Sequence, residues 1–259
     1  MHQYQPATGW TPDGGLADRF LILCGHEILM NSTGEFLWER QPWMNGHEVI
    51  RTGKLDRFSV SVIKTDSAPD EGSLVNARQF MASQPHAMAA FYSHASQILR
   101  SRKDHQFCGR CGSPCKSSEG EWARVCSVCE MTYYPRISPC IIVLVHKGNE
   151  VLLVQHKRHL RNTTMHTVIA GFIEPGETAE EAVVREIREE VGLEVGKVTY
   201  QLSQSWPFPH ALMLGYHAEY QSGDICLEED ELVSAEWFQR DNLPDIPPSF
   251  TISRQLIDL

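Results

Sequence analysis

The chain has 259 residues, of which 42% are hydrophobic and 22% are charged, and a formal net charge of −10. This composition is typical of a globular protein with one large domain or two to three smaller ones. Its longest unbroken apolar runs span six residues, whereas a membrane-spanning helix needs about 20. The acidic balance argues against a protein whose whole surface follows nucleic acid, although it leaves room for a local basic patch.

The beginning of the chain and its cysteines indicate a cellular compartment. The first 20 residues include Asp13, Asp18 and Arg19 and contain no apolar stretch, so we expect no signal peptide and a cytoplasmic protein. In that compartment the eight cysteines are expected to be metal ligands or free thiols rather than disulfides.

Residues 1–104 are predicted to form a strand-rich N-terminal domain. Short apolar runs, such as Phe20–Cys24 and Phe58–Ile63, are separated by Gly, Pro, Asp and Asn residues, a pattern typical of strands and turns. Apolar residues then recur at helical spacing over Ala87–Leu99, which predicts a helix. The polar, basic segment Arg100–His105 that follows is predicted to be a linker.

Residues 105–132 are predicted to form a zinc ribbon. The expected ligands, spaced C-x2-C-x14-C-x2-C, are Cys108, Cys111, Cys126 and Cys129. Two such pairs of thiolates suit tetrahedral Zn²⁺, and a closed site of four sulfurs leaves no position for water. We therefore expect one structural zinc per chain. Cys115 is a competing ligand by residue type, but its spacing pairs it with no other cysteine.

Residues 133–259 have the pattern of an α/β or α+β domain. Two apolar runs separated by a short polar stretch predict a hairpin. Thr178–Val191 is a predicted helix, because Thr178 and Glu181 can form a capping box and Gly192 supplies a stop. The predicted strands are Cys140–Val145, Val151–Gln155, Thr167–Ala170, Val198–Leu202 and Ala211–Tyr220.

The predicted helix carries its glutamates on one face. At about 100° per residue, Glu186 and Glu190 point about 40° apart, and Glu189 lies on the other side of Glu186. An apolar stripe borders this face and consists of Val183, Ile187 and Val191. One interpretation is a solvated acidic face, but like charges beside a buried stripe repel one another unless cations neutralise them. Oxygen ligands of this kind suit Mg²⁺ or Mn²⁺, which in turn bridge phosphate oxygens.

The segment Gly171–Leu193 fits the Nudix box, G-x5-E-x7-R-E-U-x-E-E-x-G-U with U apolar, at all nine of its fixed positions. The chain therefore resembles the Nudix hydrolase superfamily. This resemblance implies a Nudix α/β/α sandwich with a mixed sheet, here preceded by the zinc ribbon and the strand-rich domain. It also implies attack of a metal-activated water on a diphosphate.

The same resemblance implies roles for individual residues. The catalytic set is Glu177, Arg185, Glu186, Glu189 and Glu190, with Arg185 orienting the carboxylates. The ligands for magnesium or manganese are Glu186, Glu190, Glu231 and the backbone carbonyl of Ala170. The general base is one of Glu186, Glu189 and Glu190, and we favour Glu190.

The segment Ser203–Ala211 resembles the S-Q-P-W-P-F-P-x-S stretch that follows the Nudix box in NADH pyrophosphatases, a group also described as hydrolases of NAD-capped RNA. Ser205 stands where this stretch has proline. Ala211 stands where it has serine, so residue 211 offers no hydroxyl group to the substrate. Taken alone, an aromatic, proline-rich turn is as typical of a core as of a binding loop. The implied substrate-binding residues are Glu121, Tyr134, Phe172, Gln204, Ser205, Trp206, Pro207, Phe208, Pro209, His210, Ala211 and Ser253.

These resemblances imply an enzyme that cleaves NADH or NAD to NMN(H) and AMP and removes the NAD cap from RNA. They also imply a homodimer in which Tyr134 of one subunit faces Phe172 of the other across the nicotinamide. A basic segment is a candidate surface for the RNA backbone or an ordinary solvated surface, and its residues are Arg100, Arg102, Lys103, Arg110 and Lys116. Two alternatives stay open: a Nudix hydrolase of another dinucleotide or sugar nucleotide, and a zinc-ribbon binding module with an inert Nudix domain.

Overall fold

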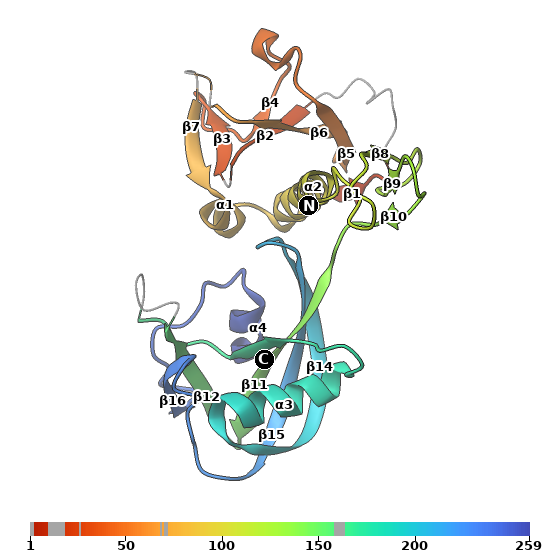
Figure 1. The fold of residues 1–259 in the computed structure, drawn as a ribbon. Coiled ribbons are helices and arrows are strands. Elements are labelled where there is room, and N and C mark those ends of the chain that lie inside the picture. Colours follow the sequence, from red (N-terminus) through yellow and green to blue (C-terminus); the bar gives the residue numbers. More distant parts are fainter. Residues whose placement is uncertain (1–2, 10–18, 26, 68, 70–71, 158–163) are drawn as a thin grey trace. The chain divides into compact units, whose positions relative to one another are not determined.

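The computed structural model describes residues 3–9, 19–25, 27–67, 69, 72–157 and 164–259. The chain divides into two compact units, Met1–Arg136 and Ile137–Leu259 (Figure 1). None of the helices in the described ranges is long and apolar enough to cross a membrane.

The first unit contains a seven-stranded sheet with the order β1-β5-β6-β2-β3-β7, and β4 pairs with β2 beside this path. Its strands are β1 (Tyr4–Pro6), β2 (Arg19–Cys24), β3 (Glu27–Asn31), β4 (Leu37–Trp38), β5 (Val49–Leu55), β6 (Phe58–Thr65) and β7 (Gly72–Asn76). The same region contains the 3-10 helix η1 (Pro42–Met44) and the helices α1 (Ala77–Ser83) and α2 (His86–Asp104). The prediction of a strand-rich N-terminal region is thereby confirmed.

The predicted linker Arg100–His105 is wrong for all but its last residue, because α2 continues to Asp104. Ser101 lies buried on the helix face that packs on the rest of the unit. Arg100 forms an i,i+4 ion pair of 2.8 Å with Asp104, and the basic side chains of the last turn interact favourably with the carboxyl end of the helix dipole. The polar composition of this segment therefore did not indicate the last turn of α2, which the burial of Ser101 and the ion pair of Arg100 with Asp104 stabilise.

A small three-stranded antiparallel sheet, with the order β10-β9-β8, follows α2. It consists of β8 (Cys115–Ser117), β9 (Arg124–Cys126) and β10 (Thr132–Tyr133). Of the four grouped cysteines, Cys108 and Cys111 precede β8, Cys126 ends β9, and Cys129 lies between β9 and β10.

The second unit contains a six-stranded mixed sheet with the order β14-β15-β11-β12-β16, and β13 pairs with β11. Its strands are β11 (Ser138–Lys147), β12 (Glu150–His156), β13 (Ile169–Phe172), β14 (Glu194–Trp206), β15 (Ala211–Ser222) and β16 (Leu232–Gln239). β11 and β15 run parallel, whereas the pairings of β11 with β12 and β13, of β12 with β16 and of β14 with β15 are antiparallel.

In the described part of this unit, two α-helices cover opposite faces of the sheet (Figure 1). α3 (Ala179–Val191) packs on alternate strand residues such as Ile141 and Val143, while α4 (Ile252–Asp258) packs on their neighbours Ile142 and Leu144. This arrangement is the predicted α/β/α sandwich with a mixed sheet.

α3 begins and ends where the sequence predicts. The Thr178 hydroxyl accepts a hydrogen bond from the Glu181 amide, and the Glu181 carboxylate accepts one from the Thr178 amide. Gly192 ends the helix in the left-handed region, with φ of 70°, where glycine avoids a steric cost. The helix therefore presents its glutamate-bearing face in a fixed register against the sheet.

Candidate active site

Arg185 lies at the centre of the acidic face of α3. All five of its N–H groups have an acceptor within hydrogen-bonding distance. Nε and Nη2 bind the two oxygens of Glu177 at 2.7 and 2.9 Å. Nη1 donates to Glu186 at 2.8 Å and to Glu189 at 2.9 Å, and Nη2 also donates to the carbonyl of Phe172 at 2.9 Å. One guanidinium group thus holds three carboxylates and the end of β13 together.

Gly171 gives Glu186 the space for its carboxylate. A Cβ atom added to Gly171 would overlap the carboxyl carbon and both oxygens of Glu186. The Glu186 side chain therefore lies directly against the backbone of β13, one residue after Ala170, whose carbonyl is an expected metal ligand. No side chain larger than hydrogen fits at residue 171 without moving this carboxylate.

The carboxylates lie in different environments. Glu190 is 3% exposed, Glu186 is partly buried and Glu189 is exposed. Burial raises the pKa of Glu186, and the nearby charges of Glu189 and Glu231 raise it further against the opposing effect of Arg185. The hydrogen bonds from Arg185 lower the pKa of Glu177 to about 2. Glu231 therefore belongs to the same electrostatic cluster, although it follows the end of α3 by 40 residues in the sequence.

This set of groups fits a divalent cation. The donors are oxygens only, which suits Mg²⁺ or Mn²⁺. Burial of Glu186 disfavours its negative charge, and a cation close to that carboxylate would offset the cost.

The segment Ser203–Ala211 is the tip of a β-hairpin. Ser203–Trp206 ends β14, Ala211 begins β15, and Trp206 pairs with Ala211 in the ladder. Only Pro207–His210 form the turn, which contains a cis peptide bond before Pro209. The Trp206 ring packs edge-on against Phe208, with centroids 5.1 Å apart, and nearly parallel to Phe250 at 6.2 Å. An aromatic cluster therefore fixes this tip.

Gln204 and Ser253 have partners within the unit. The Gln204 amide donates to the Phe250 carbonyl at 2.7 Å and accepts from the Ile252 amide at 2.9 Å. The buried Ser253 hydroxyl lies 2.8 Å from the hydroxyl of Thr167. Gln204 thus ties the hairpin to the start of α4.

His210 and Ala211 lie beside the first residue of β11. The His210 ring nitrogen Nδ1 is 3.2 Å from the Ser138 hydroxyl, and Ser138 pairs directly with Ala211 in the parallel ladder. Ser138 therefore places a hydroxyl one strand away from the position where the motif has serine. Neither Ser138 nor Thr167 is part of a sequence motif, so only strand register could have revealed them.

The predicted aromatic contacts are divided between the two units. Phe172, in the second unit, is 56% exposed, and Tyr134, in the first, is 60% exposed. The Tyr134 hydroxyl donates to a carboxylate oxygen of Glu121 at 3.2 Å, and this bond raises the pKa of Tyr134. Glu121 and Tyr134, 13 residues apart, thus form one exposed pair.

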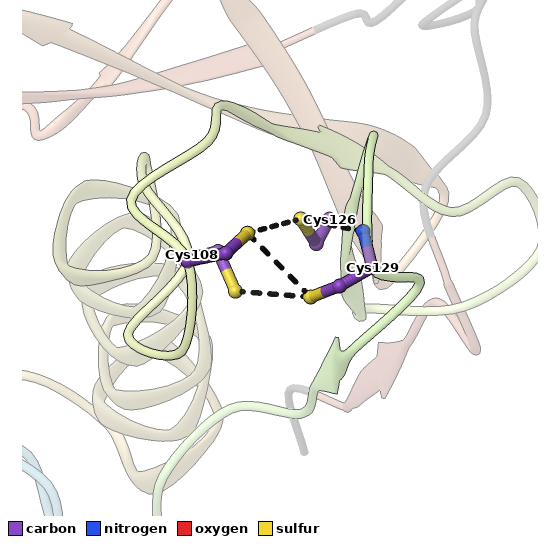
Figure 2. Close-up of side chains that lie close together, drawn as sticks. Cys108, Cys126 and Cys129 are labelled. Atoms are coloured by element: carbon purple, nitrogen blue, oxygen red, sulfur yellow. Dashed lines mark hydrogen bonds between the residues drawn. The ribbon is translucent and has the colours of Figure 1, made fainter.

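The four predicted zinc ligands converge on one point. Their sulfur atoms all lie within 4.8 Å of one another, and Figure 2 shows Cys108, Cys126 and Cys129 facing the same centre. A hydrogen bond with the Tyr133 hydroxyl lowers the pKa of Cys108 to about 6, which favours the thiolate that binds metal. Cys115 is buried and pairs with Cys126 across β8 and β9; it is not among the four grouped ligands.

Comparisons with known proteins agree with both metal-binding regions. The NUDIX domain family matches residues 135–258, and the NADH pyrophosphatase zinc ribbon domain family matches residues 103–134.

Curated relatives extend the likeness over most of the chain. The chain is 43% identical over 213 residues to the NAD-capped RNA hydrolase NudC of Klebsiella pneumoniae, covering 82% of this chain and 80% of that protein. It is 40% identical over 244 residues to the protein of the same name from Deinococcus radiodurans, covering 92% and 86%. A third relative of this name, from Pseudomonas fluorescens, is 46% identical over 182 residues, covering 70% and 65%.

Proposed function

Because the chain belongs to the NudC family of Nudix hydrolases, we propose that it cleaves the diphosphate of NADH or NAD to NMN(H) and AMP. By the same reaction it removes the NAD cap from RNA and leaves a 5′-monophosphate end. The observation that carries this proposal is the Arg185 cluster of three carboxylates within a chain that also has the zinc ribbon of NADH pyrophosphatases.

The chemistry divides between a cation and the residues of the chain. A divalent cation, when bound, neutralises charge on the diphosphate and lowers the pKa of water. The residues that would hold it are Glu186, Glu190, Glu231 and the carbonyl of Ala170. Arg185 fixes the carboxylates of Glu177, Glu186 and Glu189 in position. Glu190, the most buried carboxylate of α3, accepts the proton of the attacking water. Mg²⁺ and Mn²⁺ both fit such a set of oxygens.

The substrate is held at its nicotinamide end. Phe172 and Tyr134 are exposed aromatic rings, and such rings can stack on a planar nicotinamide. We propose that the enzyme is a homodimer in which Tyr134 of one protomer and Phe172 of the other enclose this ring. Sedimentation velocity tests the dimer: a fully active monomer at micromolar concentration would contradict it.

Two further predictions concern organisation and location. The division into residues 1–104, 105–132 and 133–259 stays a prediction that limited proteolysis can test. A cytoplasmic location also stays a prediction, one that fits the eight cysteines that the structure leaves without disulfides.

Replacing the central glutamates tests the assignment of the site. Glu186→Gln and Glu190→Gln are expected to lower the turnover of NADH by about 10² to 10⁴, the range for a lost general base, with an unchanged circular dichroism spectrum. Glu194→Gln is the matched control, because Glu194, the first residue of β14, pairs at 2.8 Å with Arg188 of α3 and not with Arg185. Near-normal turnover in both cluster variants would refute these roles.

A further inference from the structure

Tyr4–Gly9, within the first described segment of the chain, is fixed to the sheet of its unit. β1 pairs antiparallel with β5, and the Ala7 amide donates to the Thr52 carbonyl at 2.8 Å. The Tyr4 hydroxyl donates to the same carbonyl at 2.7 Å and lies 2.6 Å from Nδ1 of His94 on α2. The end of this segment therefore has a defined position relative to β5 and α2.

The same segment contacts the turn between β8 and β9 at two places. The Trp122 indole donates to the Ala7 carbonyl at 3.1 Å, and its ring packs edge-on against His94 with centroids 5.5 Å apart. Gly9 lies so close to the turn that an added Cβ atom would overlap the backbone of Gly120 and Glu121. These two contacts lie on either side of the Glu121 side chain in the sequence.

Glu121 is exposed and accepts the hydrogen bond from Tyr134. We infer that the N-terminal segment sets the position of the Glu121–Tyr134 pair, so that Gly9 and Trp122 are positioning residues for substrate binding. This inference rests on the proposed function, in which both members of the pair contact the substrate. It gives the N-terminal domain a part in substrate affinity although it lies outside the Nudix domain.

The variant Trp122→Phe is the mildest test. It removes the indole donor to Ala7 and keeps an aromatic ring beside His94. The expected result is a KM for NADH raised roughly threefold to tenfold, the equivalent of one neutral hydrogen bond, with kcat unchanged, because the binding that is lost is the same in the ground state and the transition state. Trp38→Phe is the matched control: Trp38 donates to the Leu29 carbonyl at 2.9 Å in the same unit, and its loss should leave KM unchanged.

The variant Gly9→Ala tests the second contact. Its methyl group should displace the turn that carries Glu121 and raise KM in the same way. Gly72→Ala is its control, because a Cβ there also crowds backbone, that of Met30, but leaves Glu121 untouched. Zinc content and the unfolding midpoint of each variant show whether the ribbon stays folded.

Combination with Glu121→Ala separates this inference from the proposed function. Glu121→Ala alone should raise KM roughly tenfold or more, as expected for a hydrogen bond to a charged group, and adding Trp122→Phe should raise it no further. If Glu121→Ala leaves KM unchanged, the proposed role of Glu121 fails. If Glu121→Ala raises KM but Trp122→Phe and Gly9→Ala do not, or if the effects simply add, the inference is overturned and the proposed function stands.

Discussion

Arg185 has a shape that no other cationic side chain could replace at this site. Its planar group presents donors in fixed directions, and these reach Glu177, Glu186 and Glu189 at once. A lysine ammonium is a compact point charge with three donors and could not hold the same set. The geometry of the residue, as much as its charge, therefore assembles the carboxylates.

Gly171 leads to a prediction at the same scale. Gly171→Ala should place a methyl group where the Glu186 carboxylate lies and lower kcat by about a hundredfold, since a misplacement of about 1 Å can have that effect. Steady-state turnover of NADH measures it. Gly196→Ala is the control, because the nearest atom to its Cβ is 3.9 Å away; equal losses in both variants would show that the effect is not specific to Glu186.

Short-range residue contacts could be predicted from the sequence, and longer ones could not. The pairing of Arg185 with Glu189 follows from i,i+4 spacing and is present at 2.9 Å. The contact between Gly171 and Glu186 depends on how β13 packs against α3, and the bonds of Gln204 depend on where the chain returns 46 to 48 residues later. Neither packing arrangement has a local sequence signal.

Strong local signals also decided which elements could be predicted. α3 has a capping box, an apolar stripe and a glycine stop, and it begins and ends as predicted. α4 has seven residues, fewer than the roughly 11 to 18 residues over which helical periodicity can be recognised. β16 lies at the edge of its sheet, and a register shift interrupts its pairing with β12, so its apolar alternation is irregular.

The zinc ribbon gives a prediction at the scale of an element. Cys108→Ser or Cys126→Ser should abolish zinc binding and unfold the ribbon, because structural Zn²⁺ contributes on the order of 10 kcal/mol to such modules. Metal analysis should find one zinc per chain in the parent protein and none in the variants. Cys226→Ser, a change at an exposed cysteine outside the cluster, should keep the zinc, and a parent protein that lacks zinc when purified without chelator would refute the site.

The basic segment is smaller than the sequence indicates. Arg100 pairs with Asp104, and Arg102, with 16% of its side chain exposed, pairs with Glu48 and donates to Ser117. Four of the five predicted RNA contacts are exposed, and because Arg100 is engaged by Asp104, the candidates that remain are Lys103, Arg110 and Lys116. Arg100 and Arg102 therefore serve the fold of α2 and its contact with the ribbon.

Replacing these three residues by alanine should weaken the turnover of NAD-capped RNA and leave free NADH unaffected. The slope of log affinity for capped RNA against log salt concentration should become shallower by about 2, because each of the three lost phosphate contacts to a single strand contributes about 0.7. Alanine at Lys54, Lys64 and Lys197, three exposed lysines elsewhere, removes the same charge as a control. Equal losses on RNA and NADH would mean that the three residues support the fold, and no loss on either would leave them as solvated surface.

Across the whole molecule, composition and motifs predicted the order of the regions along the chain but not the contacts through which one region positions residues of another. The net charge of −10 is consistent with an enzyme that takes RNA only through a local basic surface. No sequence motif indicates that the first hundred residues contribute to substrate affinity, because this contribution depends on contacts such as that of Ala7 with Trp122, 115 residues later. Such distant contacts become visible only when the fold is known.

Product analysis tests the central claim most directly. NADH, NAD, ADP-ribose, diadenosine compounds and NAD-capped RNA are incubated with the purified protein and Mg²⁺ or Mn²⁺, with Glu186→Gln as the blank. We predict NMNH and AMP from NADH, and NMN with 5′-monophosphate RNA from the capped transcript, in each case absent from the blank. Preferential cleavage of ADP-ribose or a diadenosine compound, with NADH and capped RNA left intact, would show another Nudix substrate; no hydrolysis with either metal would contradict an enzymatic function altogether.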